Sequence, residues 1–255
     1  MKIRVLGCSG AELPGHNLSG FLLDGTILFD AGSAAAALDR RGQSKIGHIF
    51  ITHAHLDHIR GIPFLADNIT IERRRQQVAV ISIPPVLRTI RKNLLNNALW
   101  PDFSTIPDHE SAVLRYLPLT EGQAVAAGDF SITPYRVHHS VPAVGYLVED
   151  RGKRRFFYTG DTGPTPATWK KLGDRPLHGL IIEVSFPNRM SELAVTTGHL
   201  SPLLLKEELG RLPHLPETIY ITHLKPQLAG TIKKELDKLN LRNLRLLREG
   251  ETITL

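Results

Sequence analysis

The sequence predicts an α/β fold in two successive halves, with helices covering both faces of a sheet system. Short apolar strands alternate with helical segments in each half, and clusters of polar residues directly follow several of the strands. Open sheets usually place their active sites at such strand ends. The 255 residues are 42% hydrophobic and 22% charged, which is typical of a globular chain with a full core. We therefore expect a single domain over residues 1–255.

The first half is expected to begin with short strands and to continue with two helices. The expected strands cover residues 2–6, 19–23, 26–29 and 48–51. Asp24-Gly25 separates the second strand from the third, which is a strong hairpin signal. An Ala-rich helix is expected over residues 33–40 with Ser33 as its N-cap, and residues 84–97 have helical apolar spacing after an initial proline.

The second half continues the alternation, and no internal repeat or long linker interrupts it. Its expected strands lie within residues 113–158, including 132–137, 144–148 and 156–158, and then at 180–182 and 219–221. Its expected helices cover residues 164–172, 203–212 and 232–239. The order of elements therefore resembles that of the first half.

Composition limits the classes of protein. No apolar run approaches the roughly 20 residues of a membrane helix, and we see no secretory signal, so we expect a cytoplasmic protein without a membrane partner. The single cysteine, Cys8, excludes an internal disulfide framework and a Cys-rich metal site. A net charge of +6 is compatible with a phosphate-bearing substrate or simply with solubility. Arg73-Arg74-Arg75 is expected to be a solvated helix or loop face.

The histidines concentrate after one strand, where residues 52–58 read THAHLDH. In extended backbone His53 and His55 point to the same side, and a following turn can bring Asp57 and His58 to the same cavity. Three imidazoles and one carboxylate suit zinc and other borderline divalent metals. A single closed metal site does not need four ligands from one segment. This number of candidate ligands therefore indicates two adjacent metals.

Further ligand candidates follow expected strands in the second half. They are His138 and His139, then Asp161, then His223. A carboxylate has two oxygens, so Asp161 can bridge two metals while histidines bind each of them. A lone histidine after a strand is usually a surface or core residue. Four such segments in one chain indicate a metal centre.

These residues resemble the metallo-β-lactamase superfamily. HAHLDH matches its HxHxDH signature, and His139, Asp161 and His223 fall where that family carries its later ligands. The resemblance covers nearly the whole chain, from the Asp30-Ala31-Gly32 turn onward. It implies an αββα sandwich of two mixed sheets flanked by helices, with the metals in a groove at one edge of the sheets.

The resemblance also implies two divalent metal ions and a division of ligands. One ion would be held by His53, His55 and His139, the other by Asp57, His58 and His223, and Asp161 would bridge them. Zn²⁺ is the default ion, and Mn²⁺ or Fe²⁺ also accept such ligands. His139 is favoured over His138 because it directly precedes Ser-Val-Pro-Ala-Val-Gly-Tyr, as the ligand does in similar ribonuclease Z sequences.

Three further stretches resemble the class II cyclic-nucleotide phosphodiesterases. They are residues 53–63, residues 160–164, and residues 198–202 together with 96–103. This branch implies a small phosphodiester substrate, hydrolysis of cAMP or cGMP to the 5′-monophosphate, and attack by a hydroxide that bridges the metals. The chain departs from the branch at Arg60, where an apolar residue is more usual. Its His138-His139-Ser-Val-Pro segment is closer to ribonuclease Z-like enzymes.

Several residues are candidates for work beyond metal binding. By resemblance, His199 would protonate the leaving 3′-oxygen or hold the phosphate, unless it only caps the following helix. Glu183 would hydrogen-bond His199 and set its tautomer, or be an exposed strand end. Asp57 is a general-base candidate if it is not a ligand. Trp100 can stack on a nucleobase or pack internally, and Lys225 can contact a phosphate or solvent.

Other functions share this pattern. A ribonuclease Z-like nuclease is the main alternative, although we find no long Gly- and Pro-rich arm to grip RNA, so a nucleic-acid partner is less expected. Thioester hydrolases and lactonases use the same ligands. A non-catalytic binding protein is disfavoured because the ligand set is intact. The sequence leaves open whether the chain forms a homodimer.

Overall fold

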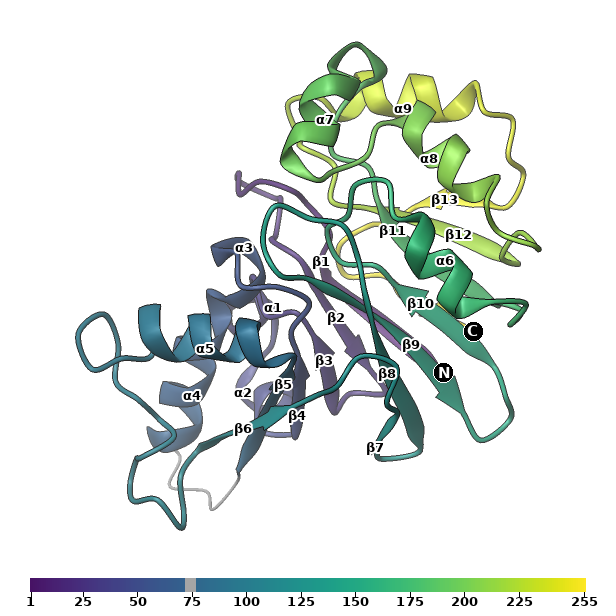
Figure 1. Cartoon of the computed structure of the whole chain (residues 1–255). Helices are drawn as coiled ribbons and strands as arrows, with labels where there is room; N and C mark the ends of the chain where they lie inside the picture. The colour runs from purple at the N-terminus through teal and green to yellow at the C-terminus, as the bar shows by residue number, and fades with distance from the viewer. Residues whose placement is uncertain (72–76) are drawn as a thin grey trace.

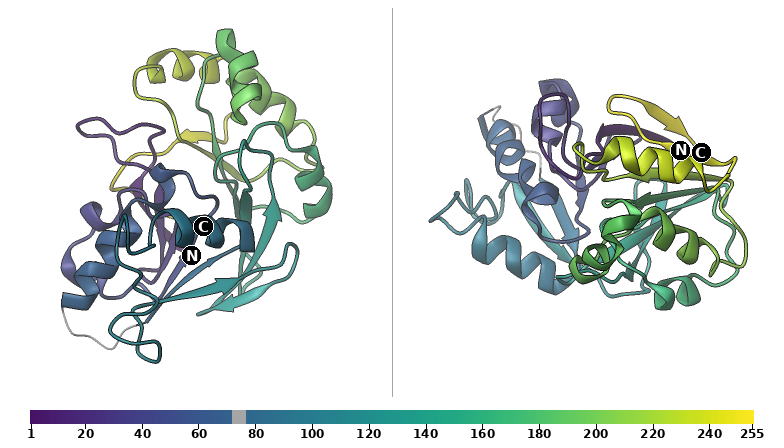
Figure 2. Two further views of the ribbon diagram at one scale, coloured as in Figure 1. Left: turned by 60° about the vertical axis from the view of Figure 1, so that its left-hand side comes forward. Right: turned by 90° about the horizontal axis from the view of Figure 1, so that it is seen from above.

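The computed structural model describes residues 1–71 and 77–255 and contains two mixed β-sheets packed face to face, with helices on the outside (Figure 1). In this part of the chain each sheet has seven strands. The helices of the first and second halves lie on opposite sides of the sheets (Figure 2). The predicted αββα sandwich is therefore confirmed. The helices cover the outer faces only, because the inner faces of the sheets pack against each other.

The first sheet has the order β14-β1-β2-β3-β4-β5-β6. Its strands are β1 (Lys2–Gly7), β2 (Gly20–Leu23), β3 (Ile27–Phe29), β4 (His48–Phe50), β5 (Val78–Ser82), β6 (Leu114–Pro118) and β14 (Thr252–Thr254). Pairing is antiparallel from β14 to β3 and parallel from β3 to β6. The helices on this side are α1 (Ala34–Ala37), α2 (Arg40–Gln43), α3 (Leu56–Ile59), α4 (Gly61–Ile71) and α5 (Pro84–Asn93).

The second sheet has the order β13-β12-β11-β10-β9-β8-β7. Its strands are β7 (Val125–Ala127), β8 (Phe130–Arg136), β9 (Val144–Asp150), β10 (Arg155–Tyr158), β11 (Gly179–Glu183), β12 (Thr218–Thr222) and β13 (Leu244–Leu246). Pairing is parallel from β13 to β10 and antiparallel from β10 to β7. Its helices are α6 (Pro166–Leu172), α7 (Ser191–Thr197), α8 (Pro202–Leu209) and α9 (Ala229–Asp237), and a short 3₁₀ helix, η1 (Asn188–Met190), precedes α7.

Aromatic side chains fill the space between the sheets. Phe29 of the first sheet packs on Phe156 of the second, with ring centroids 5.9 Å apart. Phe21 meets Tyr158 across the same interface at 4.9 Å. Phe157 points the other way and packs on Trp169 of α6, since successive residues of a strand face opposite sides. The inner core thus joins both halves of the chain. A second cluster of buried hydrophobic side chains lies between the second sheet and its helices.

The structure confirms the predicted hairpin and corrects the helix after it. Leu23 pairs with Ile27, so residues 24–26 form the hairpin turn, in which Asp24 and Gly25 have positive φ values of 43° and 74°. The helix expected over residues 33–40 breaks into α1 and α2, because Leu38 is extended and Asp39 caps a new helix by accepting from Gly42 N at 2.8 Å. Ser33 makes no side-chain cap. Its hydroxyl accepts from the Leu18 amide instead.

Other expectations differ in extent. The helix expected over residues 84–97 ends at Asn93, and β5, α4 and α7 were not expected as separate elements. The predicted solvated run at Arg73-Arg74-Arg75 lies outside the described residues. Among the helices of the described segments, none combines the length and hydrophobicity needed to cross a membrane.

Candidate metal centre

The predicted metal ligands lie at one edge of the sandwich, where several strands end. They are His53 and His55 after β4, Asp57 and His58 in α3, His139 after β8, Asp161 after β10 and His223 after β12. Strands β4, β10 and β12 each have a parallel neighbour, and the carboxyl ends of parallel strands carry the sites of open sheets. The topology therefore gathers residues that are far apart in the sequence.

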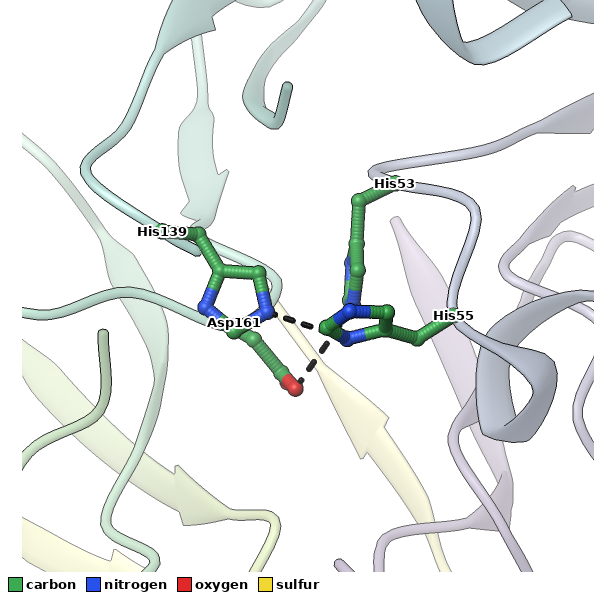
Figure 3. A group of neighbouring side chains, drawn as sticks. All are labelled: His53, His55, His139 and Asp161. Carbon is green, nitrogen blue, oxygen red and sulfur yellow. Dashed lines mark hydrogen bonds and ion pairs between the residues drawn. The ribbon is translucent and has the colours of Figure 1, made fainter. Parts of the chain in front are cut away.

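The first group of donors comprises His53, His55, His139 and Asp161, whose ligand atoms all lie within 4.8 Å of one another (Figure 3). His139 Nε2 is 3.1 Å from His55 Nδ1. His53 Nε2 is 3.7 Å from Asp161 Oδ2. The expected preference for His139 over its neighbour matches this grouping, because His138 is exposed and is not a member.

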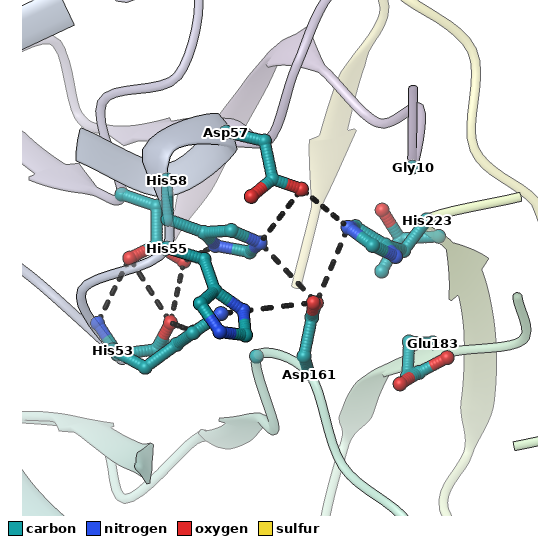
Figure 4. A network of polar contacts seen from close by, with 12 residues as sticks. Gly10, His53, His55, Asp57, His58, Asp161, Glu183 and His223 are labelled. Carbon is teal, nitrogen blue, oxygen red and sulfur yellow. Dashed lines mark hydrogen bonds and ion pairs between the residues drawn. The ribbon is translucent and has the colours of Figure 1, made fainter. Parts of the chain in front are cut away.

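The second group comprises Asp57, His58, Asp161 and His223, again within 4.8 Å (Figure 4). Asp161 Oδ1 lies 3.3 Å from His58 Nε2 and 3.4 Å from His223 Nε2. Asp57 Oδ2 lies 3.3 Å from His223 Nε2. Asp161 therefore belongs to both groups, with Oδ2 nearest His53 of the first and Oδ1 facing the second. This is the arrangement that a bridging carboxylate needs.

A glycine sets the approach of the shared carboxylate. Gly160 directly precedes Asp161 and has a φ of 61°, a conformation that other residues rarely adopt. A Cβ atom at this position would lie 2.7 Å from the Thr52 side chain. The chain can therefore bring Asp161 against the loop after β4 only because residue 160 has no side chain.

The histidines are oriented through their outer ring nitrogens. His58 Nδ1–H donates to Asp30 Oδ2 at 2.8 Å, and His139 Nδ1–H donates to the Gly198 carbonyl at 2.7 Å. Thr52 Oγ1 donates to Asp30 and so accepts from His53 Nδ1–H at 3.0 Å. Each bond leaves Nε2 of the ring with its lone pair directed into the site, as in known metal centres.

Two buried nitrogens show that these residues fit metal ions. Within the described segments, Nε2 of His53 and Nε2 of His58 are buried and have no hydrogen-bond partner. Leaving a buried polar atom unpaired costs about 1–3 kcal/mol, so such atoms usually have a function. Imidazole nitrogens and carboxylate oxygens in this number suit a divalent metal of the zinc type. The donor set therefore fits the metal ions that the fold family implies.

The pKa values favour the ligand forms of most of these side chains. Burial, aided by the nearby His58, lowers the pKa of His53 well below its usual value. Burial opposes ionisation of Asp161, but His223 and His58 lower the pKa of this carboxyl well below its usual range. Burial also opposes the charge on His58, yet Asp161 and Asp30 raise its pKa. The two carboxylates thus stabilise positive charge at His58, where a metal ion can replace the proton.

Glu183 and His199 lie beside the donor groups and contact each other. Glu183 is fully buried, so it is not an exposed strand end. Its Oε1 accepts from His199 Nδ1–H at 2.6 Å. Burial opposes the charge on His199, but Glu183 raises its pKa to about 9. The cap of α8 comes from the Ser201 hydroxyl, which accepts from the Leu204 amide. His199 therefore does not cap α8.

For the two predicted substrate-binding residues, Trp100 and Lys225, the structure gives contacts with other parts of the protein. Trp100 packs on Phe64 with ring centroids 5.4 Å apart, as the internal-packing reading expects. Lys225 Nζ donates to the Gly10 carbonyl at 3.2 Å and lies 5.3 Å from the centre of the Phe186 ring. Their contacts with a base or a phosphate stay predictions.

The residues that orient the histidines were not predicted from the sequence. Asp30 is fully buried and also accepts from the Tyr158 hydroxyl at 2.7 Å. Its position directly after β3 is the same signal that identified the ligands, so it could have been found. Thr52 also follows a strand, β4, but its role depends on a contact with Asp30, 22 positions away in the sequence.

Comparison with known proteins identifies the family. The chain matches the model of the Beta-lactamase superfamily domain over residues 25–224. It is 27% identical over 244 residues to a probable 3′,5′-cyclic-nucleotide phosphodiesterase of Yersinia pestis, covering 86% of this chain and 68% of that protein. It is 28% identical over 221 residues to ribonuclease Z of Thermococcus onnurineus, covering 80% of this chain and 66% of that protein. The chain thus spans about two thirds of the length of these relatives.

A solved structure shares the fold over the full length. The crystal structure of unliganded yeast PDE1 superimposes with a TM-score of 0.85 at 20% identity, covering 100% of this chain and 99% of that chain. The family match includes the HxHxDH segment, Asp161 and His223. The chain therefore belongs to the β-lactamase superfamily and is one of its metallo-β-lactamase-fold hydrolases.

Proposed function

We propose that this protein is a dinuclear metal phosphodiesterase that hydrolyses 3′,5′-cyclic nucleotides to 5′-monophosphates. The observation that carries the proposal is Asp161, whose two oxygens face two separate donor groups. The similarity to a probable cyclic-nucleotide phosphodiesterase supports this choice of substrate. A net charge of +6 agrees with an anionic substrate.

The two donor groups would each hold one ion. His53, His55 and His139 would bind the first, Asp57, His58 and His223 the second, and Asp161 both. When bound, a pair of divalent ions supplies the Lewis acidity that neutralises a phosphodiester and activates water. Zn²⁺ suits the nitrogen and oxygen donors, and Mn²⁺ or Fe²⁺ are accepted by the same set.

His199 would serve as the general acid. Its ring lies 5.1 Å from the His139 ring and 5.7 Å from the His223 ring, so it stands beside both donor groups. Glu183 holds the proton on Nδ1, which leaves Nε2 to deliver a proton to the leaving 3′-oxygen. A positioned acid of this kind contributes about 10²–10⁴-fold to rate. In this assignment Asp57 is a ligand, not a base.

Two residues would contact the rest of the substrate. Lys225 lies two residues after His223 in the sequence. Its ammonium group would pair with a phosphate oxygen of the substrate. Trp100 would offer an aromatic face to the base, as flat rings do in many nucleotide sites. Replacement of Lys225 or Trp100 by alanine should raise KM more than it lowers kcat.

A ribonuclease Z-like nuclease is the second candidate. The 28% identity to a ribonuclease Z favours it, and the same two donor groups would serve an RNA phosphodiester. An RNA substrate would need contacts beyond the metal edge, whereas a cyclic nucleotide needs only the residues already near it. The two functions can be separated by substrate choice alone.

A substrate panel tests the proposal. The zinc-loaded protein would be offered cAMP, cGMP, bis(p-nitrophenyl) phosphate and a precursor tRNA, with Asp161→Ala as the inactive variant. Conversion of cAMP or cGMP to the 5′-monophosphate, with intact tRNA, is the expected result. Cleavage of tRNA with untouched cyclic nucleotides would establish the nuclease instead. Turnover of none of the four would overturn both and direct attention to thioesters and lactones.

A further inference from the structure

The Ser185 hydroxyl occupies a junction between the second donor group and the Glu183–His199 pair. Ser185 lies two residues past the end of β11 and is fully buried. Its Oγ is 2.7 Å from Glu183 Oε2 and 3.0 Å from His223 Nδ1. It also lies 3.3 Å from His199 Nδ1, a longer contact than the 2.6 Å from that nitrogen to Glu183.

The directions of these hydrogen bonds follow from the number of protons. A hydroxyl has one proton to donate, and an ionised carboxylate can only accept. Glu183 already accepts from the Thr162 amide at 3.0 Å and from His199. The Ser185 hydroxyl also lies 3.2 Å from the His223 carbonyl, but Glu183 Oε2 is the nearer acceptor at 2.7 Å and is charged. Ser185 therefore donates to Glu183, and its oxygen lone pairs remain to accept from His223 Nδ1–H at 3.0 Å.

This pattern fixes the orientation of a metal ligand. With the Nδ1 proton of His223 held by Ser185, Nε2 is left toward Asp57 and Asp161, at 3.3 and 3.4 Å. His58, His53 and His139 obtain the same effect from Asp30, Thr52 and the Gly198 carbonyl, respectively. His223 repeats the arrangement of His53, whose hydroxyl partner Thr52 donates to the buried carboxylate of Asp30.

We propose that Ser185 is a positioning residue that holds His223 as a ligand of the second metal ion and links it to Glu183. One buried carboxylate then orders two parts of the site, His199 directly and His223 through Ser185. The inference rests on the proposed metal pair, although not on the identity of the phosphodiester. It predicts that Ser185 acts on the second metal ion only.

A competing arrangement uses the same atoms. Glu183, His199 and His223 also lie within 4.8 Å of one another and form a third group of donors in the described part of the chain. The hydrogen bonds account for their closeness, because Nδ1 of each ring already has an oxygen partner. A third metal would have to displace both protons.

The test is metal binding by Ser185→Ala, with Ser185→Thr as the variant that keeps the hydroxyl. Each purified protein would be equilibrated in zinc buffers of graded free Zn²⁺, and bound zinc measured by mass spectrometry. The wild type and Ser185→Thr should bind two ions. Ser185→Ala should keep one and lose affinity for the other by about 10–100-fold, as expected when the partner of a ligating histidine is removed.

A second measurement uses the wild-type protein, so that the inference is testable even if Ser185→Ala does not fold. Nitrogen-15 NMR of the zinc-loaded wild type should show a slowly exchanging proton on His223 Nδ1, assigned by its absence in His223→Gln. A metal-coordinated His223 Nδ1, or a rapidly exchanging proton there, would overturn the inference.

The possible results separate the two proposals. Two ions bound by Ser185→Ala with wild-type affinity, or equal weakening of both ions, would refute the role of Ser185 and leave the metal pair intact. Three ions in the wild type would favour the competing arrangement and refute it too. If the wild type binds no zinc, manganese or iron, the metal pair itself fails, and the inference with it.

Discussion

At the scale of single residues, the site depends on side chains that serve two neighbours at once. Asp161 faces both donor groups. Asp30 holds His58 directly and His53 through Thr52. Substitution of Asp161 or Asp30 should therefore disturb more than one ligand and abolish metal binding and catalysis together. A substitution that lowers activity but leaves the metal ions bound should be found only outside the donor groups.

His199→Ala is the substitution that separates them. The variant should retain both metal ions, because the ring belongs to neither bridged group, and kcat should fall about 10²–10⁴-fold through loss of the acid. The measurement is kcat together with bound metal. A loss of metal from His199→Ala would place this residue among the ligands. Asp129→Ala, at a side chain 71% exposed, is the surface control and should change neither quantity.

The single cysteine should be inert in the folded protein. Burial, with smaller contributions from Glu249 and Glu251, raises the pKa of the Cys8 thiol to about 12. The thiolate is the reactive form, so at pH 8 a disulfide reagent such as Ellman's should react slowly with native protein and rapidly after unfolding in guanidinium. Equal rates in the two states would show that the thiol is not shielded.

At the scale of elements, several apolar strands were predictable, and so was the gathering of the predicted metal ligands at strand ends. Residues 48–51 and 219–221 were expected as strands, and they match β4 and β12 closely. The break between α1 and α2 was not predicted, although Asp39 is a local signal for it, because its side chain caps α2 by accepting from Gly42 N. The hydrogen-bond partners of the histidines were not predicted, because they come from distant segments. Ser185 and His223, for example, are 38 positions apart in the sequence.

One close contact between elements gives a sharp prediction. Gly10, in the loop after β1, lies so near His223 that a Cβ atom would be 2.5 Å from its carbonyl oxygen and 2.8 Å from its Nδ1 (Figure 4). Gly10→Ala should therefore lower the free energy of unfolding by about 1–3 kcal/mol, measured by urea denaturation. It should also weaken metal binding through the displaced His223.

Gly47→Ala is the matched control for this change. A Cβ at Gly47 meets nothing within 4 Å, and its backbone is not in the left-handed region. Its free energy of unfolding should stay within about 0.5 kcal/mol of the wild type. If Gly10→Ala were equally neutral, the loop after β1 would not be packed against His223 as described.

At the scale of the whole molecule, the two sheets are held together by one inner core. Phe29 is 1% exposed and contacts Phe156, Tyr146 and Tyr158 of the opposite sheet. We propose on this basis that the halves form one domain. The sequence predicted two mixed sheets through its family resemblance, but it could not specify which aromatic rings meet, since that depends on how the sheets pack.

Truncation of this core residue should test how the layers are held. Phe29→Ala should lower the free energy of unfolding by about 3–5 kcal/mol, because it removes a buried ring and leaves a cavity between the sheets. Phe64→Ala, where the residue is 47% exposed, should cost much less. Urea denaturation followed by fluorescence and circular dichroism measures both. Separate transitions for the two probes in the wild type would contradict a single domain.

The two-metal site is tested most directly by locating the metal ions in crystals of the zinc-loaded protein through anomalous scattering at the zinc edge. We expect two peaks, one among His53, His55 and His139 and one among Asp57, His58 and His223, with Asp161 contacting both. A single peak, or two peaks of which only one touches Asp161, would contradict the proposed two-metal site.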